Sequence, residues 1–477
     1  MSLRKQALSG MIWTFSQQFG AQIISFTVGI ILARLLLPSD FGTIAMFSVV
    51  LAIGGSLVDS GMSSSLIRTN DADQKDFSTV FWFNLVVSIL IYGLIFFLAP
   101  LIARFYEVEI LTDIIRISSI TIIINAFSAI QSTRLVKEMN FKTLFKIRLP
   151  SLIIGGITGI VLALNGFGIW ALVFYPIVQS IVSSIQFWIY GKWKPSLIFD
   201  KEKYKYHFHY GYKLTLSGLL DTLFKNAYTV IIGKLFSPVQ LGYYNRADTL
   251  KQLPVANLSA ALNSVTFPLF AKISHNDIKL KEVYRKLMKL VIFIIGPVLC
   301  LMVVAAEPMI RFLLTEKWLP AVPYFQVLAF AGILIPIHSY NLNVLKVKGR
   351  SDLFLKLEIW KKLLVVAILL VSTRFGIMGI VWGQVTGSVI AFFINTYYTG
   401  KILNYGSFQQ IGDLLPTLCL SALTALVLYG VDLNFLSGMH DFFRLVVLTL
   451  SFVLIYLSSA WLLKFKEFDY IKELLNR

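Results

Sequence analysis

The 477-residue chain is 57% hydrophobic and only 14% charged, and its mean hydropathy is +0.74. This composition excludes a soluble globular protein, because apolar stretches of about twenty residues, long enough to cross a bilayer, recur along the whole length. The net charge of +18 is therefore expected at the membrane edges and does not indicate nucleic-acid binding.

Fourteen apolar helices are predicted, and the fold class is an all-α polytopic membrane protein. The longest hydrophilic connection, 191–213, is too short for a soluble domain and is expected to lie at the membrane interface. The spans predicted in the first half are 11–37, 41–66, 78–103, 111–133, 147–164 and 167–190. Those predicted in the second half are 212–236, 239–268, 286–314, 321–345, 353–373, 376–400, 412–431 and 442–464.

Two segments that lie 200 residues apart share one sequence pattern. The sequence ILARLLLPSDFG at 31–42 returns as IIGKLFSPVQLG at 231–242, with a proline and a glycine in matching positions. A weaker echo links NGFGIWALV at 165–173 to TRFGIMGIV at 373–381. Internal repeats of this kind indicate a transporter built from two related halves, with its substrate site near the middle of the membrane.

The repeat and the spans together predict two pseudo-symmetric lobes of six helices, followed by two further helices. The predicted boundaries are 1–191 for the N-lobe, 192–211 for a cytoplasmic interfacial linker, 212–401 for the C-lobe, and 402–477 for the last two spans and the tail.

The basic residues predict the orientation of the spans. An even number of spans puts both termini on one side, and most of the 43 Lys and Arg fall in connections on that side, such as 134–148, 192–213 and 272–289. The opposite connections are short and carry acids, such as Glu107 and Asp432. Because cytoplasmic loops are enriched in Lys and Arg, both termini are expected in the cytoplasm.

Several ionisable residues fall inside predicted spans, where each charge costs about 3 kcal/mol on insertion scales. Such groups are expected to face a wet cavity or a partner. Six cations and three acids share this depth: Arg34, Arg116, Lys225, Lys234, Arg246, Lys251, Asp59, Asp221 and Asp248. The excess of cations suits a substrate whose head is a phosphate or pyrophosphate. The candidate pyrophosphate ligands are Arg246, Lys251, Arg116, Arg34 and Lys225.

Polar stripes on the spans 11–37 and 212–236, and charged residues on the spans 41–66 and 239–268, predict that these four helices line the cavity. The candidate polar lining residues are Gln18, Gln22, Thr222 and Asn226. These charged residues also have a structural interpretation, in which they pair with each other or reach the lipid headgroups and do not bind a substrate. Asp221 with Lys225, and Asp248 with Lys251, are spaced to pair along one helix face. Arg34 and Lys234 lie near a membrane interface, where their side chains can reach the headgroups.

Enzyme and metal signatures are scarce in the sequence. Asp71 and Asp73 have the spacing of a metal-binding DxD motif, but their short loop favours a helix-start turn. No metal-ligand cluster, nucleophile elbow or phosphate-binding glycine loop is recognised, so neither an enzymatic activity nor a bound cofactor is predicted. A proton or sodium ion is the coupling ion considered, with Asp59, Asp221 and Asp248 as candidate sites.

Six segments of the chain carry a likeness to a known family: SLRKQALSGMIW at 2–13, LARLLLPSDFG at 32–42, LVDSGMSSSLIR at 57–68, FPLFAKIS at 267–274, VYRKLMKL at 283–290 and TEKWLPAVPYFQVLAFAGIL at 315–334. In the order and spacing of these segments the chain resembles the Wzx-type polysaccharide flippases of the multidrug/oligosaccharidyl-lipid/polysaccharide (MOP) exporter superfamily. The resemblance implies a flippase that moves an undecaprenyl-pyrophosphate-linked oligosaccharide, a repeat unit for lipopolysaccharide or exopolysaccharide, outward across the bacterial inner membrane by alternating access.

The resemblance also has implications for partners and site residues. It implies contacts with membrane lipids, a polysaccharide polymerase and chain-length proteins. It further implies arginines on helices one, two and eight around the pyrophosphate. Arg34 and Arg246 match helices one and eight, whereas helix two carries Asp59 instead.

Three alternatives to this function remain open. They are a MATE-like exporter of drugs or metabolites, a flippase for lipid-linked peptidoglycan or teichuronic acid precursors, and a membrane-embedded polysaccharide polymerase. The first would favour an acidic or apolar cavity. The last would require a sizeable external loop, and none is predicted.

Overall fold

The computed structural model describes the backbone of residues 3–59 and 61–470, and it leaves the side chains of 3–12, 59, 257, 258 and 260–265 undescribed. The helices of the first half are α1 (Leu3–Leu35), α2 (Pro38–Asp59), α3 (Met62–Arg68), α4 (Gln74–Tyr106), α5 (Leu111–Ser118), α6 (Ile120–Lys137), α7 (Phe141–Leu164), α8 (Trp170–Gly191) and α9 (Lys201–Leu235). The second half contains α10 (Pro238–Lys272), α11 (Asp277–Val304), α12 (Ala306–Leu314), α13 (Val322–Val347), α14 (Ser351–Ser372), α15 (Gly376–Leu403), α16 (Ser407–Val431) and α17 (Asp441–Leu462). Short helical turns occupy Glu316–Ala321, Thr373–Phe375 and Asp432–Leu436.

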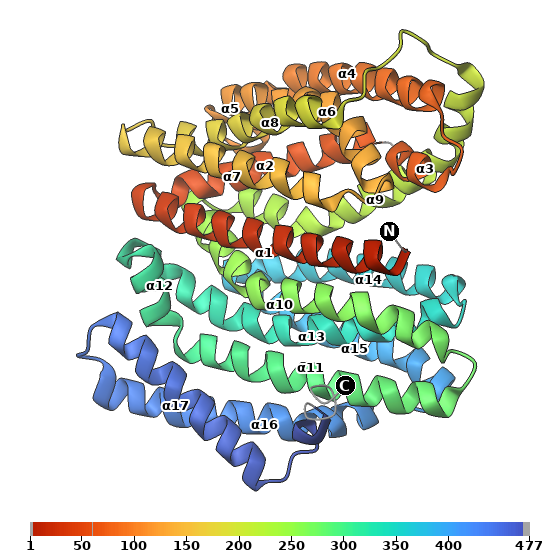
Figure 1. Cartoon of the computed structure of the whole chain (residues 1–477). Coiled ribbons are helices and arrows are strands. Elements are labelled where there is room, and N and C mark those ends of the chain that lie inside the picture. Colours follow the sequence, from red (N-terminus) through yellow and green to blue (C-terminus); the bar gives the residue numbers. More distant parts are fainter. Residues whose placement is uncertain (1–2, 60, 471–477) are drawn as a thin grey trace. The chain divides into compact units, whose positions relative to one another are not determined.

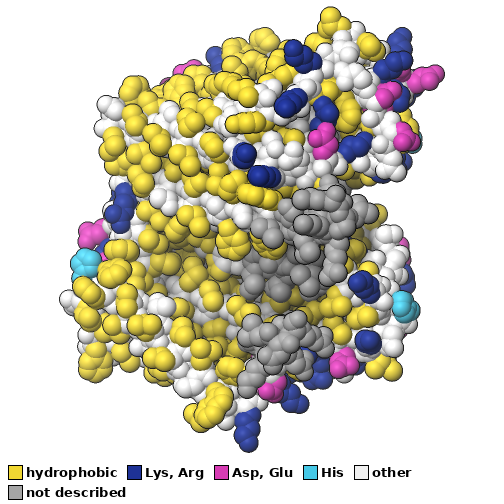
Figure 2. Space-filling model, in the orientation of Figure 1, with side chains coloured by type: hydrophobic (Ala, Val, Ile, Leu, Met, Phe, Trp, Pro, Cys, Tyr) yellow, Lys and Arg dark blue, Asp and Glu magenta, His cyan; other side chains and the backbone are white. Residues whose placement is uncertain are grey.

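The predicted all-α membrane fold is confirmed, since the described residues form helices and no strand. Eleven described stretches are long and apolar enough to cross a membrane, and they cover twelve of the fourteen predicted spans because Ser351–Leu403 contains two helices. Apolar side chains occupy much of the face shown in Figure 2. Leu94, Phe97 and Leu101 of α4 are each more than half exposed. Such a surface is stable in lipid and not in water.

The two predicted spans outside these stretches are 212–236 and 239–268, which correspond to α9 and α10. Both helices contain 35 residues, so their length suffices for a span. Their polarity sets them apart: α9 carries Asp221 and Lys225, and α10 carries Arg246, Asp248 and Lys251. The number of fourteen spans therefore stays a prediction.

Three predicted spans are interrupted in the structure. Span 41–66 breaks between α2 and α3, span 111–133 breaks at Ser119, and span 286–314 breaks at Ala305. The first break has a clear physical cause in Gly61, whose φ of +62° favours glycine. A Cβ at Gly61 would also lie 2.6 Å from the carbonyl oxygen of Gly211 in α9, so the break lets α3 approach α9 closely.

The chain folds into two compact units, the first formed by Met1–Gly242 and the second by Tyr243–Arg477. In the first unit α7 packs on both α1 and α8 (Figure 1). Glycines of α7 make this packing close, because a Cβ at Gly155 would collide with Gln179 of α8 and one at Gly156 with Val28 of α1. Gly155 and Gly156 thus allow α7 to pack tightly on its two neighbours.

Helix α9 packs on α2, α3 and α4 within the first unit. The connection before it is bound to α4: Trp82 donates to the carbonyl oxygen of Ser196 at 2.8 Å, and the Asp200 N–H donates to Thr79 at 3.0 Å. Asp200 then caps α9, which already begins at Lys201. Residues 201–211 of the predicted linker are thus helical and continuous with the following span, while the proposed lobe boundaries stay a prediction.

The two copies of the repeat contact each other where α2 and α10 begin. A Cβ added to Gly42 would overlap the carbonyl oxygen of Pro238, and one added to Gly242 would overlap that of Pro38. All four residues belong to the first unit. The matching proline and glycine positions of the repeat therefore form a reciprocal crossing, in which each glycine leaves room for the other copy's proline carbonyl.

The second unit has a core of α11, α13, α15 and α16, with α17 packed on α16 and α12. Aromatic rings fill it, including Tyr284, Tyr340 and Phe270, none more than 1% exposed. A buried ion pair joins α17 to the turn after α16: Arg444 donates two hydrogen bonds to Asp432, at 2.5 and 2.6 Å. Arg444 therefore lies in the protein interior.

Candidate functional site

Arg34 and Arg116, two predicted pyrophosphate ligands of the first unit, differ in their exposure and contacts. Arg34 lies exposed in the last turn of α1. Arg116 of α5 is half-buried, with its guanidinium 4.4 Å from the centroid of the Phe96 ring and its Nε donating to the Phe96 carbonyl oxygen at 3.3 Å. Arg116 is thus held against α4 by an aromatic face and a backbone acceptor.

The polar stripe on α9 is present, but its predicted ion pair is not formed. Asp221 and Lys225 are both exposed, and within the described part of the chain Lys225 has no ion pair. Thr222 donates to the Gly218 carbonyl oxygen at 2.8 Å, and Asn226 donates to that of Thr222 at 2.8 Å. The hydroxyl and the amide N–H therefore bond to their own helix, which leaves the Lys225 ammonium as the free donor of this stripe.

Lys234, the cation that corresponds to Arg34 in the repeat, has a structural partner. Its ammonium donates to Glu107 at 2.7 Å and lies 5.4 Å from the centroid of the Phe105 ring. This hydrogen bond lowers the pKa of Glu107. Lys234 thus links the end of α9 to the turn that follows α4.

Helix α10 carries three of the charges predicted at membrane depth: Arg246, Asp248 and Lys251. Arg246 is half-buried and lies 5.7 Å from the centroid of the fully buried Trp318 ring. Lys251 is 4% exposed and pairs with Asp248, as the sequence spacing predicts. A Cβ on Gly332 of α13 would lie 3.1 Å from the Lys251 side chain. Lys251 is therefore neutralised and packed, whereas Arg246 contacts an aromatic ring.

The proposed ion-coupling residues differ in their surroundings. The side chain of Asp59 lies outside the described residues. Asp221 is exposed and Asp248 is paired with Lys251. The described residues contain no group of three His, Cys, Asp or Glu side chains that could hold a metal ion. Asp73 of the DxD motif caps α4 by accepting from two backbone N–H groups, the helix-start role that its loop predicted.

Gln18 and Gln22 line a polar pocket of 560 Å³ inside the first unit. Its wall is formed by α1, α7 and α8. The polar groups are four glutamines, four hydroxyl side chains and one arginine: Gln17, Gln18, Gln22, Gln179, Thr14, Ser25, Ser151, Ser183 and Arg148. The prediction of Gln18 and Gln22 as lining residues fits this pocket, whereas Arg148 belongs by sequence to the basic connection 134–148.

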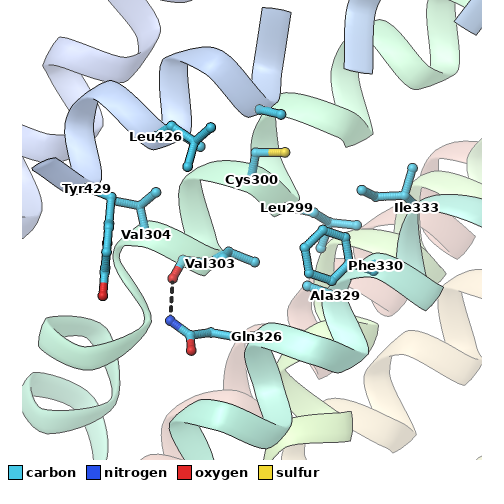
Figure 3. A pocket seen from close by; sticks show the side chains of 12 residues that line it. Leu299, Cys300, Val303, Val304, Gln326, Ala329, Phe330, Ile333, Leu426 and Tyr429 are labelled. Atoms are coloured by element: carbon cyan, nitrogen blue, oxygen red, sulfur yellow. Dashed lines mark hydrogen bonds between the residues drawn. The ribbon is translucent and has the colours of Figure 1, made fainter. Parts of the chain in front are cut away.

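The second unit contains an apolar pocket of 510 Å³ between α11, α13 and α16 (Figure 3). Cys300, Phe330 and Leu426 each contribute to its wall. The polar side chain of Gln326 donates to the Val303 carbonyl oxygen at 3.2 Å, so its amide N–H is satisfied within the wall. The surface that remains is mostly hydrocarbon, with the Tyr429 hydroxyl and the Cys300 thiol among the lining groups, and it suits an aliphatic chain better than a charged headgroup.

A buried polar cluster that the sequence did not reveal connects α3, α4 and α9. His207 is fully buried; its Nε2 lies 2.9 Å from Asp76 and its Nδ1 lies 2.8 Å from the Ser65 hydroxyl. Lys203 donates to the other oxygen of Asp76 at 2.9 Å. A neutral His207 satisfies both contacts, by donating from Nε2 and accepting at Nδ1. The cluster fixes the start of α9 against α3 and α4.

This cluster predicts a stability that depends on pH. Burial lowers the pKa of His207, which precedes the predicted span, although Asp76 opposes that effect and Lys203 and Lys137 reinforce it. The unfolded chain then binds more protons than the folded one below about pH 6.5, so stability falls as the pH drops through this region. Thermal unfolding in detergent should show this loss, and His207→Gln should flatten the pH dependence. An unchanged pH profile in His207→Gln would contradict the assignment.

Comparisons with solved structures define the class of the fold. The lipid II flippase MurJ in an inward closed conformation matches with a TM-score of 0.75 and 16% identity, covering 95% of this chain and 99% of that one. An inward-facing MATE family transporter of the MOP superfamily matches with a TM-score of 0.64 and 17% identity, covering 81% and 96%. The chain thus has the fold of these multi-pass membrane proteins.

Sequence comparison then gives the family. The chain belongs to the polysaccharide biosynthesis protein family, whose sequence pattern matches residues 31–323. The teichuronic acid biosynthesis protein TuaB of Bacillus subtilis (strain 168) is 28% identical over 439 residues, covering 91% of this chain and 90% of that protein. The lipopolysaccharide biosynthesis protein WzxC of Escherichia coli (strain K12) is 25% identical over 451 residues, covering 90% of each. The predicted resemblance to polysaccharide flippases is confirmed.

Proposed function

We propose that this protein flips an undecaprenyl-pyrophosphate-linked oligosaccharide from the cytoplasmic to the outer leaflet of the bacterial inner membrane, by alternating access and without enzymatic chemistry. One observation carries the proposal. The chain is a member of the polysaccharide biosynthesis family with a MurJ-like fold, and six of the nine ionisable residues predicted at membrane depth lie on α9 and α10. Charged residues at membrane depth mark substrate pathways.

The cationic excess of these helices supports a pyrophosphate head over a cationic drug. We assign Lys225 and Arg246 first, Lys225 because it has no ion pair with a described residue and Arg246 because of its guanidinium group. Lys251 ranks lower because its ammonium pairs with Asp248. Arg116 and Arg34 are assigned as secondary contacts. A guanidinium matches phosphate oxygens with two parallel hydrogen bonds, which favours Arg246 for the principal contact.

The apolar pocket of the second unit supports a lipid-linked cargo. Its hydrocarbon wall between α11, α13 and α16 is complementary to an isoprenoid chain. An oligosaccharide without a lipid would gain nothing from this surface, because burying hydroxyl groups against hydrocarbon is unfavourable. The sugar is not specified by these features, so a teichuronic acid or peptidoglycan precursor remains an alternative cargo of the same chemical class.

The proposal extends to location, energy and partners. The distribution of Lys and Arg supports cytoplasmic termini.

Outward movement of an anionic head through an inside-negative potential is favourable by about 2.3 kcal/mol per charge per 100 mV. A proton or sodium ion bound at Asp59, Asp221 or Asp248 would then reset the empty carrier. A polysaccharide polymerase and chain-length proteins would receive the product.

The test is a set of variants at Arg246 in a bacterial strain that lacks its own copy of this gene. Arg246→Ala should abolish polysaccharide export while its abundance in the membrane stays normal. Arg246→Lys should restore a minor part, because an ammonium lacks the planar fork. Arg374→Ala, at an exposed arginine of the turn after α14, is the charge-matched control and should export normally. Full export by Arg246→Ala would overturn the assignment of this residue.

A further inference from the structure

We propose that the polar pocket between α1, α7 and α8 binds a sugar of the cargo that carries a carboxylate. This inference rests on the proposed function and deepens it, since it specifies the chemical class of one sugar. Gln17, Gln18 and Gln22 of α1, Gln179 of α8 and Arg148 of α7 are the groups that carry it. The pocket's 560 Å³ lies within the range of about 300–1,000 Å³ typical of small-molecule sites.

The glutamines provide the first argument. Within the described part of the chain, the side-chain amides of Gln17, Gln18, Gln22 and Gln179 have no hydrogen-bond partner. The α1 members lie in Trp13–Leu35, a stretch apolar enough to cross a membrane. Uncharged amides at such a depth need water or a ligand. Each amide both donates and accepts, as recognition of sugar hydroxyl groups requires.

Arg148 provides the second argument, because its positive charge indicates that the ligand is an anion. It lies seven residues after the start of α7, which places it about 10 Å along the helix. No acid lines the pocket, and Arg148 has no ion pair with a described residue. A guanidinium in this position favours an anion and can bind a carboxylate through two hydrogen bonds.

The composition of the wall distinguishes between anions. A pyrophosphate carries about two charges and is held in proteins by several cations or backbone donors. Here one cation is accompanied by eight uncharged polar side chains. That ratio matches a singly charged, hydroxyl-rich ligand such as a hexuronic acid. A zwitterionic lipid headgroup fits poorly, because its amine would meet no carboxylate.

The experiment compares two defined cargoes in proteoliposomes. Both are undecaprenyl-pyrophosphate-linked disaccharides, one ending in glucuronate and the other in glucose. The measured quantity is the ratio of the two transport rates. The parent protein should favour the glucuronate cargo, and Arg148→Gln should lower the ratio by roughly tenfold, as expected for loss of a charge-assisted hydrogen bond. Arg148→Lys should recover part of it. Lys146→Gln, an exposed cation on the same helix, should leave the ratio unchanged.

Three outcomes would overturn the inference. The parent protein could show no preference between the two cargoes, or Arg148→Gln could leave the ratio unchanged. The effect of Arg148→Gln could also vanish when phosphatidylglycerol is omitted from the liposomes, and the anion bound by Arg148 would then be a lipid headgroup. A parent protein that moves neither cargo would contradict the proposed function instead. Saturation-transfer NMR with methyl glucuronide and methyl glucoside then still tests the pocket, because binding requires no transport. Equal signals from the two sugars would reject the inference that the pocket prefers a carboxylate.

Discussion

Replacing Gly242 with alanine is expected to destabilise the protein by about 1–3 kcal/mol, the cost of overpacking a closed contact. The added Cβ would overlap the carbonyl oxygen of Pro38. That oxygen belongs to the backbone at the start of α2, so it cannot rotate away as a flexible side chain would. Gly42→Ala should cost a similar amount, because its Cβ would overlap the Pro238 carbonyl oxygen in the same way.

The measurement is the midpoint of thermal unfolding of the detergent-solubilised protein, followed by size-exclusion fluorescence after heating. Gly93→Ala is the matched control, since a Cβ at that glycine of α4 would meet nothing within 4 Å. A Gly242→Ala protein as stable as Gly93→Ala would show that α2 and α10 do not cross in the manner described.

Arg444→Leu is expected to have the second large effect, a loss of about 3–5 kcal/mol. Arg444 and Asp432 are 3% and 2% exposed, and their bidentate pair joins α17 to the turn after α16. Removing the arginine alone leaves a buried carboxylate without its partner. The same change also removes a contact of 4.0 Å between Arg444 and Glu307.

The double variant Arg444→Leu with Asp432→Leu distinguishes the effect of the ion pair on stability from the effect of side-chain packing. Replacing both charges with apolar groups should restore most of the stability, because the desolvation cost of the carboxylate disappears. Arg104→Leu, at an exposed arginine near the end of α4, should change the unfolding midpoint little. Equal losses in the single and double variants would show that the ion pair is not the source of the effect.

The architecture was predictable where it depends on local hydrophobicity. Long apolar runs such as 78–103 and 147–164 predicted α4 and α7 directly. The helix breaks were less accessible, because Gly61 reads as one glycine among the chain's 30 until its φ and its contact with Gly211 are known. The repeat revealed the equivalence of Gly42 and Gly242, but their mutual contact is a tertiary property.

The candidate site depended more strongly on long-range packing. Asp76 and His207 are 131 residues apart, so no sequence spacing connects them. Arg148 follows Lys142 and Lys146 and belongs by composition to a basic connection. A useful signal did exist: Gln18, Gln22 and Ser25 repeat at helical spacing on α1, as Arg148 and Ser151 do on α7. That pattern shows a polar face for each helix, but only the packing of α1, α7 and α8 reveals a shared pocket.

The protein is proposed to move a lipid-linked oligosaccharide across a bilayer, and purified protein in vesicles tests this most directly. The vesicles contain an undecaprenyl-pyrophosphate-linked oligosaccharide with a fluorescent sugar, and the measured quantity is the fraction of sugar accessible to a membrane-impermeant quencher. The labelled head should redistribute between leaflets in vesicles with the parent protein, whereas vesicles with Arg246→Ala should behave like protein-free ones. Equal redistribution with and without the parent protein would contradict the proposed function.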